Sequence, residues 1–165
     1  MTKSTKRGQA LIELALVLPL LFWLIINVVN IGSFCYAWIT VSNAARAGAV
    51  FLSLGPASAY APNAPTADAV KSMLVGVSGE LSSLGGYNTP SITKVFVFGN
   101  NITNADGPGP VDLESSLFAG CAVRVEYLST PLIPFWDFPG LGIHLTWPPP
   151  AGVWIKRTVT TRMLQ

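Results

Sequence analysis

The chain has 165 residues, of which 50% are hydrophobic and 11% are charged, whereas soluble domains carry about 25% charged residues. This composition favours a membrane protein or a dense assembly, and the length leaves room for one globular domain of roughly 100 residues beside a long apolar helix. After the first eight residues, seven Lys or Arg stand against eight Asp or Glu, which argues against nucleic acid as a partner because such a domain needs a basic face.

The chain begins with a basic leader, MTKSTKRG, that contains Lys3, Lys6 and Arg7. A basic cluster before an apolar stretch predicts an N-terminus inside the cell and a C-terminal domain outside it. The acid Glu13 follows inside the apolar stretch, and residues 14–45 contain no Asp, Glu, Lys or Arg. A carboxylate within a membrane span costs about 2.5–3.5 kcal/mol unless it has a partner, so Glu13 requires an explanation.

The charge-free run of 32 residues predicts a helix about 48 Å long, which exceeds the ~30 Å hydrocarbon core of a bilayer. We expect residues 9–54 to form one helix that spans the membrane in its first half, because LALVLPLLFWLIINVV is apolar on every side. Pro19 is expected to kink this span, since proline removes one backbone hydrogen bond. Residues 55–66 follow as a linker rich in Pro and Ala.

A short amphipathic helix is predicted after the linker. Thr66 is a favourable N-cap, and we expect the helix to continue as far as Gly85-Gly86. Its apolar residues recur at intervals of three and four, the spacing of a stripe that faces a core: Val70, Leu74, Val77, Leu81 and Leu84.

Three strands are predicted at residues 91–99, 121–128 and 153–164, which are rich in β-branched and aromatic residues. In the second strand, four residues are expected to face the core and to alternate with Arg124 and Glu126: Cys121, Val123, Val125 and Tyr127. Residues 67–165 are therefore expected to form an extracytoplasmic α+β domain in which a helix packs on an antiparallel sheet of about three strands.

The run KRGQALIELALVLPLL, followed by NAARAGAVF, resembles the N-terminal segment of TadE-like minor pilins (pseudopilins) of the tight-adherence (Flp) pilus system, within the type IV pilin superfamily. The stretch CAVRVEYLSTPLIPF…TVTTRML is also similar to their distal strands. The resemblance implies that a prepilin peptidase cuts after Gly8 and that the mature chain begins at Gln9, so that residues 1–8 are a cytoplasmic leader. Glu13 is then the fifth mature residue, where pilins carry a glutamate, and Pro19 fills the role of their helix-bending proline.

Cleavage before Gln9 exposes an α-amino group that is cationic near neutral pH. Between staggered subunits, the Glu13 carboxylate of one chain can meet the amine of the next, and this pairing sets the axial register of the helices. Small residues let neighbouring helices approach closely, and seven of them are candidates for this contact: Ala10, Ala15, Gly32, Ala37, Ala44, Ala45 and Gly48.

The resemblance implies a single-pass protein of the bacterial inner membrane that helps to start, cap or anchor a Flp-type pilus. The partners it implies are other pilins or pseudopilins, the prepilin peptidase, the inner-membrane assembly platform and the lipid bilayer. It implies neither a cofactor nor an enzymatic activity. The alternative function is a membrane-anchored binding or adhesion domain that never polymerises, which leader processing and co-purification with pilins would distinguish.

Other targeting signals fit less well. The A-x-A patterns of a signal-peptidase site lie in residues 45–49, too far beyond the apolar core that ends near Val29. A lipoprotein site at Cys35 would need a small residue where Phe34 stands. A plain uncleaved anchor explains the topology but leaves Glu13 unexplained.

No motif for catalysis or metal binding is present. The single histidine, His144, is expected to be a packed or edge residue, although a tethered hydrolase would need it. The Asn and Asp residues of residues 100–112 match no EF-hand and are expected to form a solvated turn rather than a calcium site. Two isolated, buried thiols are expected at Cys35 and Cys121 in preference to a disulfide.

Residues 129–152 form an irregular segment rich in proline and aromatic residues. Its aromatic residues either fill the core of the small domain, form a subunit interface or form a membrane-interface belt. Trp136 and Phe138 are our candidates for the interface, and a Trp136→Ala variant that folds but does not assemble would support that role.

Overall fold

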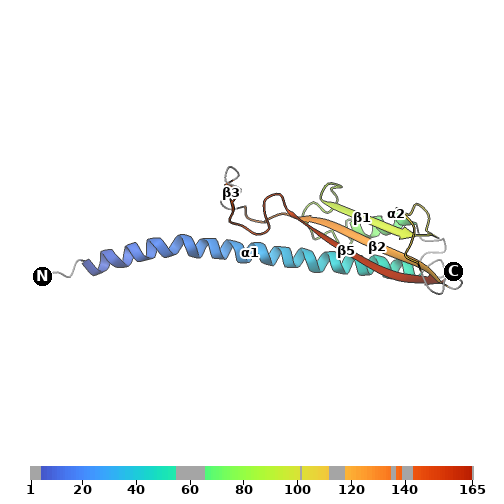
Figure 1. Ribbon diagram of the computed structural model, residues 1–165, viewed down its shortest axis with the longest axis horizontal. Helices are drawn as coiled ribbons and strands as arrows, with labels where there is room; N and C mark the ends of the chain where they lie inside the picture. The colour runs from blue at the N-terminus through green and yellow to red at the C-terminus, as the bar shows by residue number, and fades with distance from the viewer. Residues whose placement is uncertain are drawn as a thin grey trace. The chain divides into compact units, whose positions relative to one another are not determined.

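The computed structural model describes residues 5–54, 66–100, 102–111, 118–134, 137–138 and 143–164, with the backbone alone for residues 5–7, 137–138, 143–144 and 164. The elements follow in the order α1 (Thr5–Ser53), α2 (Ala67–Val75), β1 (Thr93–Gly99), β2 (Phe118–Ser129), β3 (Asp137–Phe138), β4 (Ile143–His144) and β5 (Val153–Leu164) (Figure 1). The chain divides into two compact units. The first contains the chain up to Cys35 together with Thr130–Gly152, and the second contains Tyr36–Ser129 together with Val153–Gln165.

Helix α1 is a single helix of 49 residues, rich in the leucines and alanines that favour this conformation. Pro19 lies inside it, where the carbonyl of Ala15 loses its usual backbone donor. Every residue from Gly8 to Ile25 is exposed. Within the described residues, α1 is the one helix long and apolar enough to cross a membrane, which is consistent with a single-pass anchor.

The second unit contains a three-stranded antiparallel sheet in the order β1-β2-β5. In the central strand β2, Val125 lies opposite Val95 of β1 on one side and Arg157 of β5 on the other. All three predicted strands are therefore present, and β2 begins three residues earlier than expected, at Phe118.

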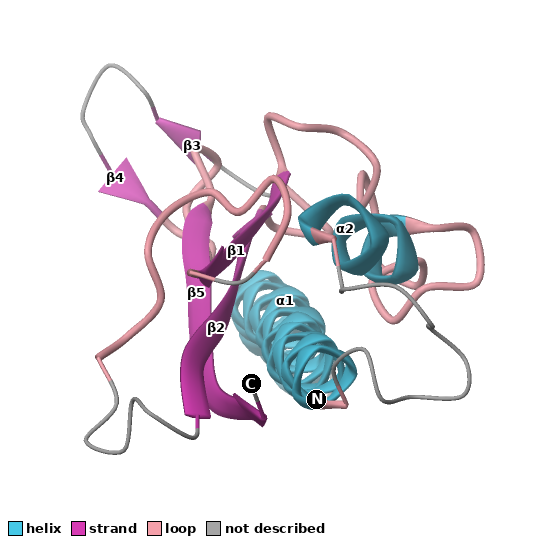
Figure 2. Ribbon diagram, turned by 90° about the vertical axis from the view of Figure 1, so that its right-hand side faces the viewer, coloured by secondary structure: helices cyan, strands magenta, loops and turns pink. Residues whose placement is uncertain are grey.

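Helix α2 and the part of α1 that belongs to the second unit lie on the same side of this sheet (Figure 2). Between helices and sheet lies a core of side chains with no exposed surface: Val41, Leu52, Val70, Leu74, Val97, Val123 and Val125. Gly48 permits close contact, because a Cβ atom there would lie 3.1 Å from both Leu74 and Val123. The predicted α+β fold, with a long apolar helix followed by a short helix and a three-stranded antiparallel sheet, is confirmed.

Helix α2 is shorter than predicted. Its N-terminus is as expected, because the Thr66 hydroxyl accepts a hydrogen bond from the Ala69 amide at 3.1 Å. The prediction that the helix continues to Gly85-Gly86 is wrong, since the chain leaves the helix at Gly76 in an extended conformation and Val77 is 90% exposed. Leu81 nevertheless returns to the core, where its amide donates to the Leu74 carbonyl at 3.2 Å.

In the first unit, the segment Thr130–Gly152 contains the two-residue strands β3 and β4, which pair antiparallel. The rest of the described segment has no regular secondary structure, as its prolines predicted.

Candidate functional site

The N-terminal part of α1 carries the residues to which the sequence assigns a role. Because Gln9 and Glu13 are one helical turn apart, their side chains lie on the same face of the helix. The Gln9 Nε2 amide donates to the Glu13 Oε1 carboxylate oxygen at 3.1 Å, and both side chains are exposed. In the described part of the chain this neutral amide is the only partner of the Glu13 carboxylate.

The surroundings of Glu13 are apolar. The neighbouring side chains Leu11, Ile12 and Leu14 are each more than half exposed. At Gly8 a Cβ atom would meet nothing within 4 Å, so packing inside this chain does not require glycine there. Pro19 lies in the same exposed stretch and, with Trp23 and Leu145 among others, lines an apolar hollow of the first unit.

The seven small residues of α1 divide into two groups. Ala10, Ala15 and Gly32 are exposed, and a Cβ atom at Gly32 would meet nothing within 4 Å. The other four are buried inside the second unit: Ala37, Ala44, Ala45 and Gly48. The expectation that all seven line a contact with neighbouring helices is therefore wrong for these four, because the sheet and α2 already cover that face.

Two asparagines of α1 hold the segment Thr130–Gly152 in the first unit, a role that was not predicted from the sequence. Asn30, which has no exposed surface, donates from Nδ2 to the Ile133 carbonyl at 3.0 Å and accepts from the Ile133 amide at 2.9 Å. Asn27 donates to the Leu145 carbonyl at 3.1 Å and accepts from the Trp147 amide at 3.1 Å.

Trp23 adds a fifth hydrogen bond to this contact, from its indole Nε1 to the Leu145 carbonyl at 2.7 Å. Phe34 packs edge-on against Trp147, with ring centroids 6.2 Å apart. We call these two asparagines, with Trp23 and their backbone partners, the asparagine clasp.

The aromatic residues of the predicted interface are only partly described. Trp136 lies outside the described residues, as does Phe135, and Phe138 is placed by its backbone in β3. Trp147 and Trp154 are both partly exposed. Lys94 of β1 lies over the Trp154 ring, with Nζ 5.2 Å from its centroid, so Trp154 belongs to the surface of the sheet and not to the core.

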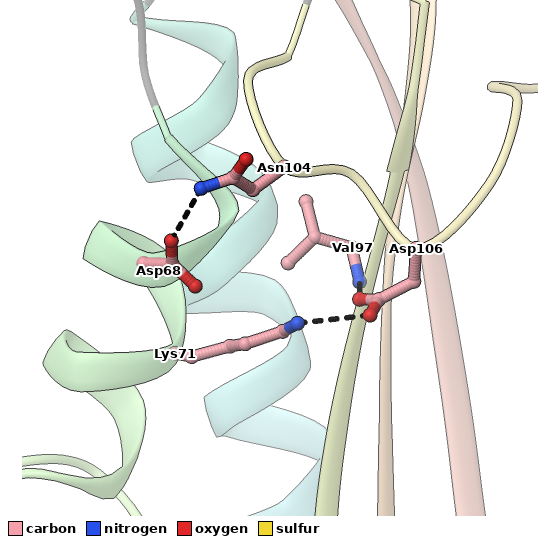
Figure 3. A network of polar contacts seen from close by, with 5 residues as sticks. All are labelled: Asp68, Lys71, Val97, Asn104 and Asp106. Carbon is pink, nitrogen blue, oxygen red and sulfur yellow. Dashed lines mark hydrogen bonds and ion pairs between the residues drawn. The ribbon is translucent and has the colours of Figure 1, made fainter.

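The polar loop after β1 is a structural connection (Figure 3). The Asp106 carboxylate accepts from Lys71 Nζ of α2 at 2.9 Å and from the Val97 amide of β1 at 2.7 Å. Asn104, which has a positive φ of 60°, donates to Asp68 at 2.8 Å. These oxygens are engaged in hydrogen bonds and ion pairs, and the described residues contain no group of three His, Cys, Asp or Glu that could hold a metal ion.

The remaining candidate residues do not assemble into a site. His144 is placed by its backbone in β4. Both cysteines are free, but the expectation that both thiols are buried is wrong for Cys35, which is exposed on α1. Cys121 is buried in β2, and burial raises the pKa of its thiol.

Comparison with known protein families gives a match in the N-terminal helix. The family model described as TadE-like protein matches residues 8–50, which is the part of α1 that contains Gly8, Gln9, Glu13 and Pro19. The resemblance read from the N-terminal motif is therefore confirmed over this segment. No curated protein and no solved structure matches the chain.

Proposed function

We propose that this chain, whose residues 8–50 are TadE-like, is a minor pilin (pseudopilin) of a Tad/Flp-type pilus. It is made as a precursor in the inner membrane, with residues 1–8 as a cytoplasmic leader that a prepilin peptidase removes after Gly8. The observation that carries the proposal is Glu13, an acid on the exposed apolar part of α1 whose only partner within the described residues is a neutral amide.

Cleavage would change the surroundings of this acid. Gln9 becomes the first residue, so a new α-amino group appears one turn before Glu13, where the Gln9 side chain now donates. A carboxylate in hydrocarbon is strongly penalised unless it is paired. The amine of a neighbouring, axially staggered subunit provides that pairing, which fixes how the helices are offset.

The open space at Gly8 supports the leader hypothesis. Glycine is unfavourable inside a helix, by about 1 kcal/mol relative to alanine, so it is usually kept for a reason. Apart from the adjoining helix backbone, no atom of the described residues lies within 4 Å of a Cβ atom built there. Access of a protease to the backbone at the scissile bond gives such a reason.

The exposed first part of α1 also supports assembly through this helix. From Gly8 to Ile25 its residues are exposed among the described residues, and they are mostly apolar. In the proposed function lipid covers them in the precursor, and the helices of other pilins cover them after the assembly platform moves the subunit into the pilus. The second unit would be extracytoplasmic and would provide partner specificity. The role needs neither a cofactor nor an active site.

The proposal is tested by Glu13→Val in the native host. The variant is expected to lose its leader normally, because the cleavage site is intact, but to co-purify poorly with other pilins. The matched control is Glu80→Val, which changes an exposed acid of the second unit. Normal co-purification of the Glu13 variant would contradict the role of Glu13 in assembly. Absence of other pilins from the purified wild-type chain would favour an anchored domain that does not polymerise.

A further inference from the structure

The segment Thr130–Gly152 has a composition that suits a low-dielectric environment. Between Glu126 and Lys156 the only charged residue is Asp137. Six of the segment's 23 residues are prolines, which have no backbone N–H group: Pro131, Pro134, Pro139, Pro148, Pro149 and Pro150. For a segment with few charges and few backbone donors, the free-energy cost of transfer from water into a membrane is lower than for an ordinary loop.

The asparagine clasp fixes where along α1 this segment lies. Trp23, Asn27 and Asn30 follow Glu13 by 10, 14 and 17 residues. At 1.5 Å per residue these positions lie about 15, 21 and 26 Å from Glu13 along the helix axis. With Glu13 at the cytoplasmic boundary of a hydrocarbon core about 30 Å thick, Trp23 lies at the midplane, and Asn27 and Asn30 lie in the outer half of the core.

The clasp pairs polar groups of α1 with backbone groups of the segment at this depth. Each asparagine amide both donates to and accepts from the backbone of the segment, and the Trp23 indole donates to the Leu145 carbonyl. Irregular backbone is tolerated at membrane depth only where such groups find partners in the protein. The asparagine amides and the backbone groups of the segment therefore supply each other with hydrogen-bond partners where water is absent.

Two large apolar side chains in the described part of the segment are exposed. Leu132 is 67% exposed, and Trp147 remains 48% exposed although its ring contacts Phe34 of α1. Tryptophan is enriched where a bilayer meets water, because its ring is apolar and its N–H is polar. The exposed apolar part of α1 belongs to the same compact unit, and Leu145 of the segment lines an apolar hollow with Leu18 and Trp23 of that helix.

We propose that the described residues 130–134 and 145–152 form a second membrane-contacting segment, held in the outer leaflet by the asparagine clasp, with lipid acyl chains as the occupants of its exposed apolar surface. The inference rests on the membrane span of the proposed function. It adds that the chain contacts the bilayer at two places far apart in sequence, so that the segment limits how far α1 can slide along the membrane normal.

The test measures the depth of Leu132 in the full-length protein, reconstituted at one copy per lipid nanodisc. Cys35→Ser removes the exposed thiol, whereas the buried Cys121 is retained, and Leu132→Cys then takes an environment-sensitive fluorophore. Two matched sites are labelled in the same way: Leu20 in the span and Val77, which is 90% exposed in the second unit. Quenching is compared between lipids brominated on their acyl chains and aqueous iodide.

The label at Leu132 is expected to show blue-shifted emission, to be quenched by the brominated lipids and to be protected from iodide, as at Leu20. The label at Val77 is expected to show the opposite pattern. Iodide quenching at Leu132 equal to that at Val77, with Leu20 still in lipid, would overturn the inference while leaving the span intact. Protection of Leu132 that appears only with several copies per disc would overturn it in favour of a subunit interface.

A second variant tests the clasp itself. Asn30→Leu makes α1 more apolar, so insertion of the span is retained, but it removes both hydrogen bonds to Ile133. The label at Leu132 is then expected to lose its lipid quenching while the label at Leu20 keeps it. Asn43→Leu, at an exposed asparagine of the same helix, is expected to change neither label. Unchanged lipid quenching in Asn30→Leu would contradict the role of the clasp.

If neither Leu20 nor Leu132 is quenched by lipid, the span of the proposed function fails together with the inference. This result differs from the failure of the inference alone, in which Leu20 remains in lipid.

Discussion

Asn30 binds the Ile133 peptide as a neighbouring strand would, with one donated and one accepted hydrogen bond. An asparagine side chain can do this because its amide has the same donor and acceptor as the peptide group. Burial of the Asn30 amide and the Ile133 backbone groups carries a small free-energy cost, because each of these polar atoms has a hydrogen-bond partner. A single side chain therefore fixes a loop that begins 100 residues later in the sequence.

The two cysteines provide a residue-scale prediction. A maleimide reagent is expected to modify Cys35 alone in the native protein in detergent at neutral pH. Cys121 should react only after unfolding, because it is buried and because burial raises the pKa of its thiol, which lowers the fraction of reactive thiolate. Intact mass before and after denaturation counts the labels. A native protein that takes no label, and whose mass is lower by two hydrogen atoms, would indicate a disulfide instead.

Asp106 connects α2 to the edge strand β1, and its two contacts should differ in strength. Asp106→Ala leaves the amide of fully buried Val97 without its acceptor, which is expected to lower the free energy of unfolding by about 1–3 kcal/mol. Lys71→Ala removes only a partly exposed ion pair and is expected to cost at most about 1 kcal/mol.

Urea unfolding of the full-length protein in detergent micelles, followed by near-UV circular dichroism, measures both changes. Equal losses in the two variants would show that the ion pair, and not the buried amide, determines the contribution of Asp106.

At the scale of elements, α1 is one helix with two different environments. Its first part exposes apolar side chains, and its second part packs small residues against the sheet and α2. Two glycines show the difference. A Cβ atom at Gly32 would meet nothing within 4 Å, whereas a Cβ atom at Gly48 would lie 3.1 Å from Leu74 and from Val123.

This contrast predicts opposite outcomes for the same substitution. Gly48→Leu overfills a packed site and is expected to lower the free energy of unfolding by about 1–3 kcal/mol. Gly32→Leu is expected to leave the unfolding of the second unit unchanged but to reduce co-purification with other pilins, because it blocks close approach of a neighbouring helix. Urea unfolding and co-purification of both variants check this. Normal assembly of Gly32→Leu would remove that residue from the proposed contact surface.

Elements with a strong local pattern were predictable from the sequence. The charge-free run predicted α1, and the β-branched residues predicted the three strands of the sheet. The end of α2 was not predictable, because Leu81 keeps the helical spacing although the chain has already left the helix at Gly76. A turn closed by the Leu81 amide and the Leu74 carbonyl returns the side chain to the core and imitates a continuous stripe.

The candidate site was predictable only where its signal is local. Gly8, Gln9 and Glu13 lie within six residues and form a recognisable motif, which the TadE-like match covers. Asn27 and Asn30 were visible as polar residues in an apolar helix, but their partners are backbone groups more than 100 residues away. The side-chain sequence contains no pattern that predicts a hydrogen bond to a distant backbone group, so the asparagine clasp could be identified only in the structure.

At the scale of the whole molecule, the proposed function depends on the positions of the charged residues along the chain. Three basic residues precede Gly8, one acid lies in the exposed apolar helix, and the remaining charges lie beyond residue 45. In the proposed function the first group holds the N-terminus in the cytoplasm and is then removed. The acid remains and is paired by the amine that the removal creates.

The most direct test of the account is the N-terminus of the native protein, purified from membranes of its own host and measured by intact mass and by the mass of its N-terminal peptide. The proposed function predicts a native chain that begins at Gln9. It also predicts that the Gly8→Leu variant accumulates as the full-length precursor. The control variant Gly85→Leu, at another glycine with open space, is expected to be processed normally. A native chain that begins at Met1 or Thr2 would contradict the proposed function.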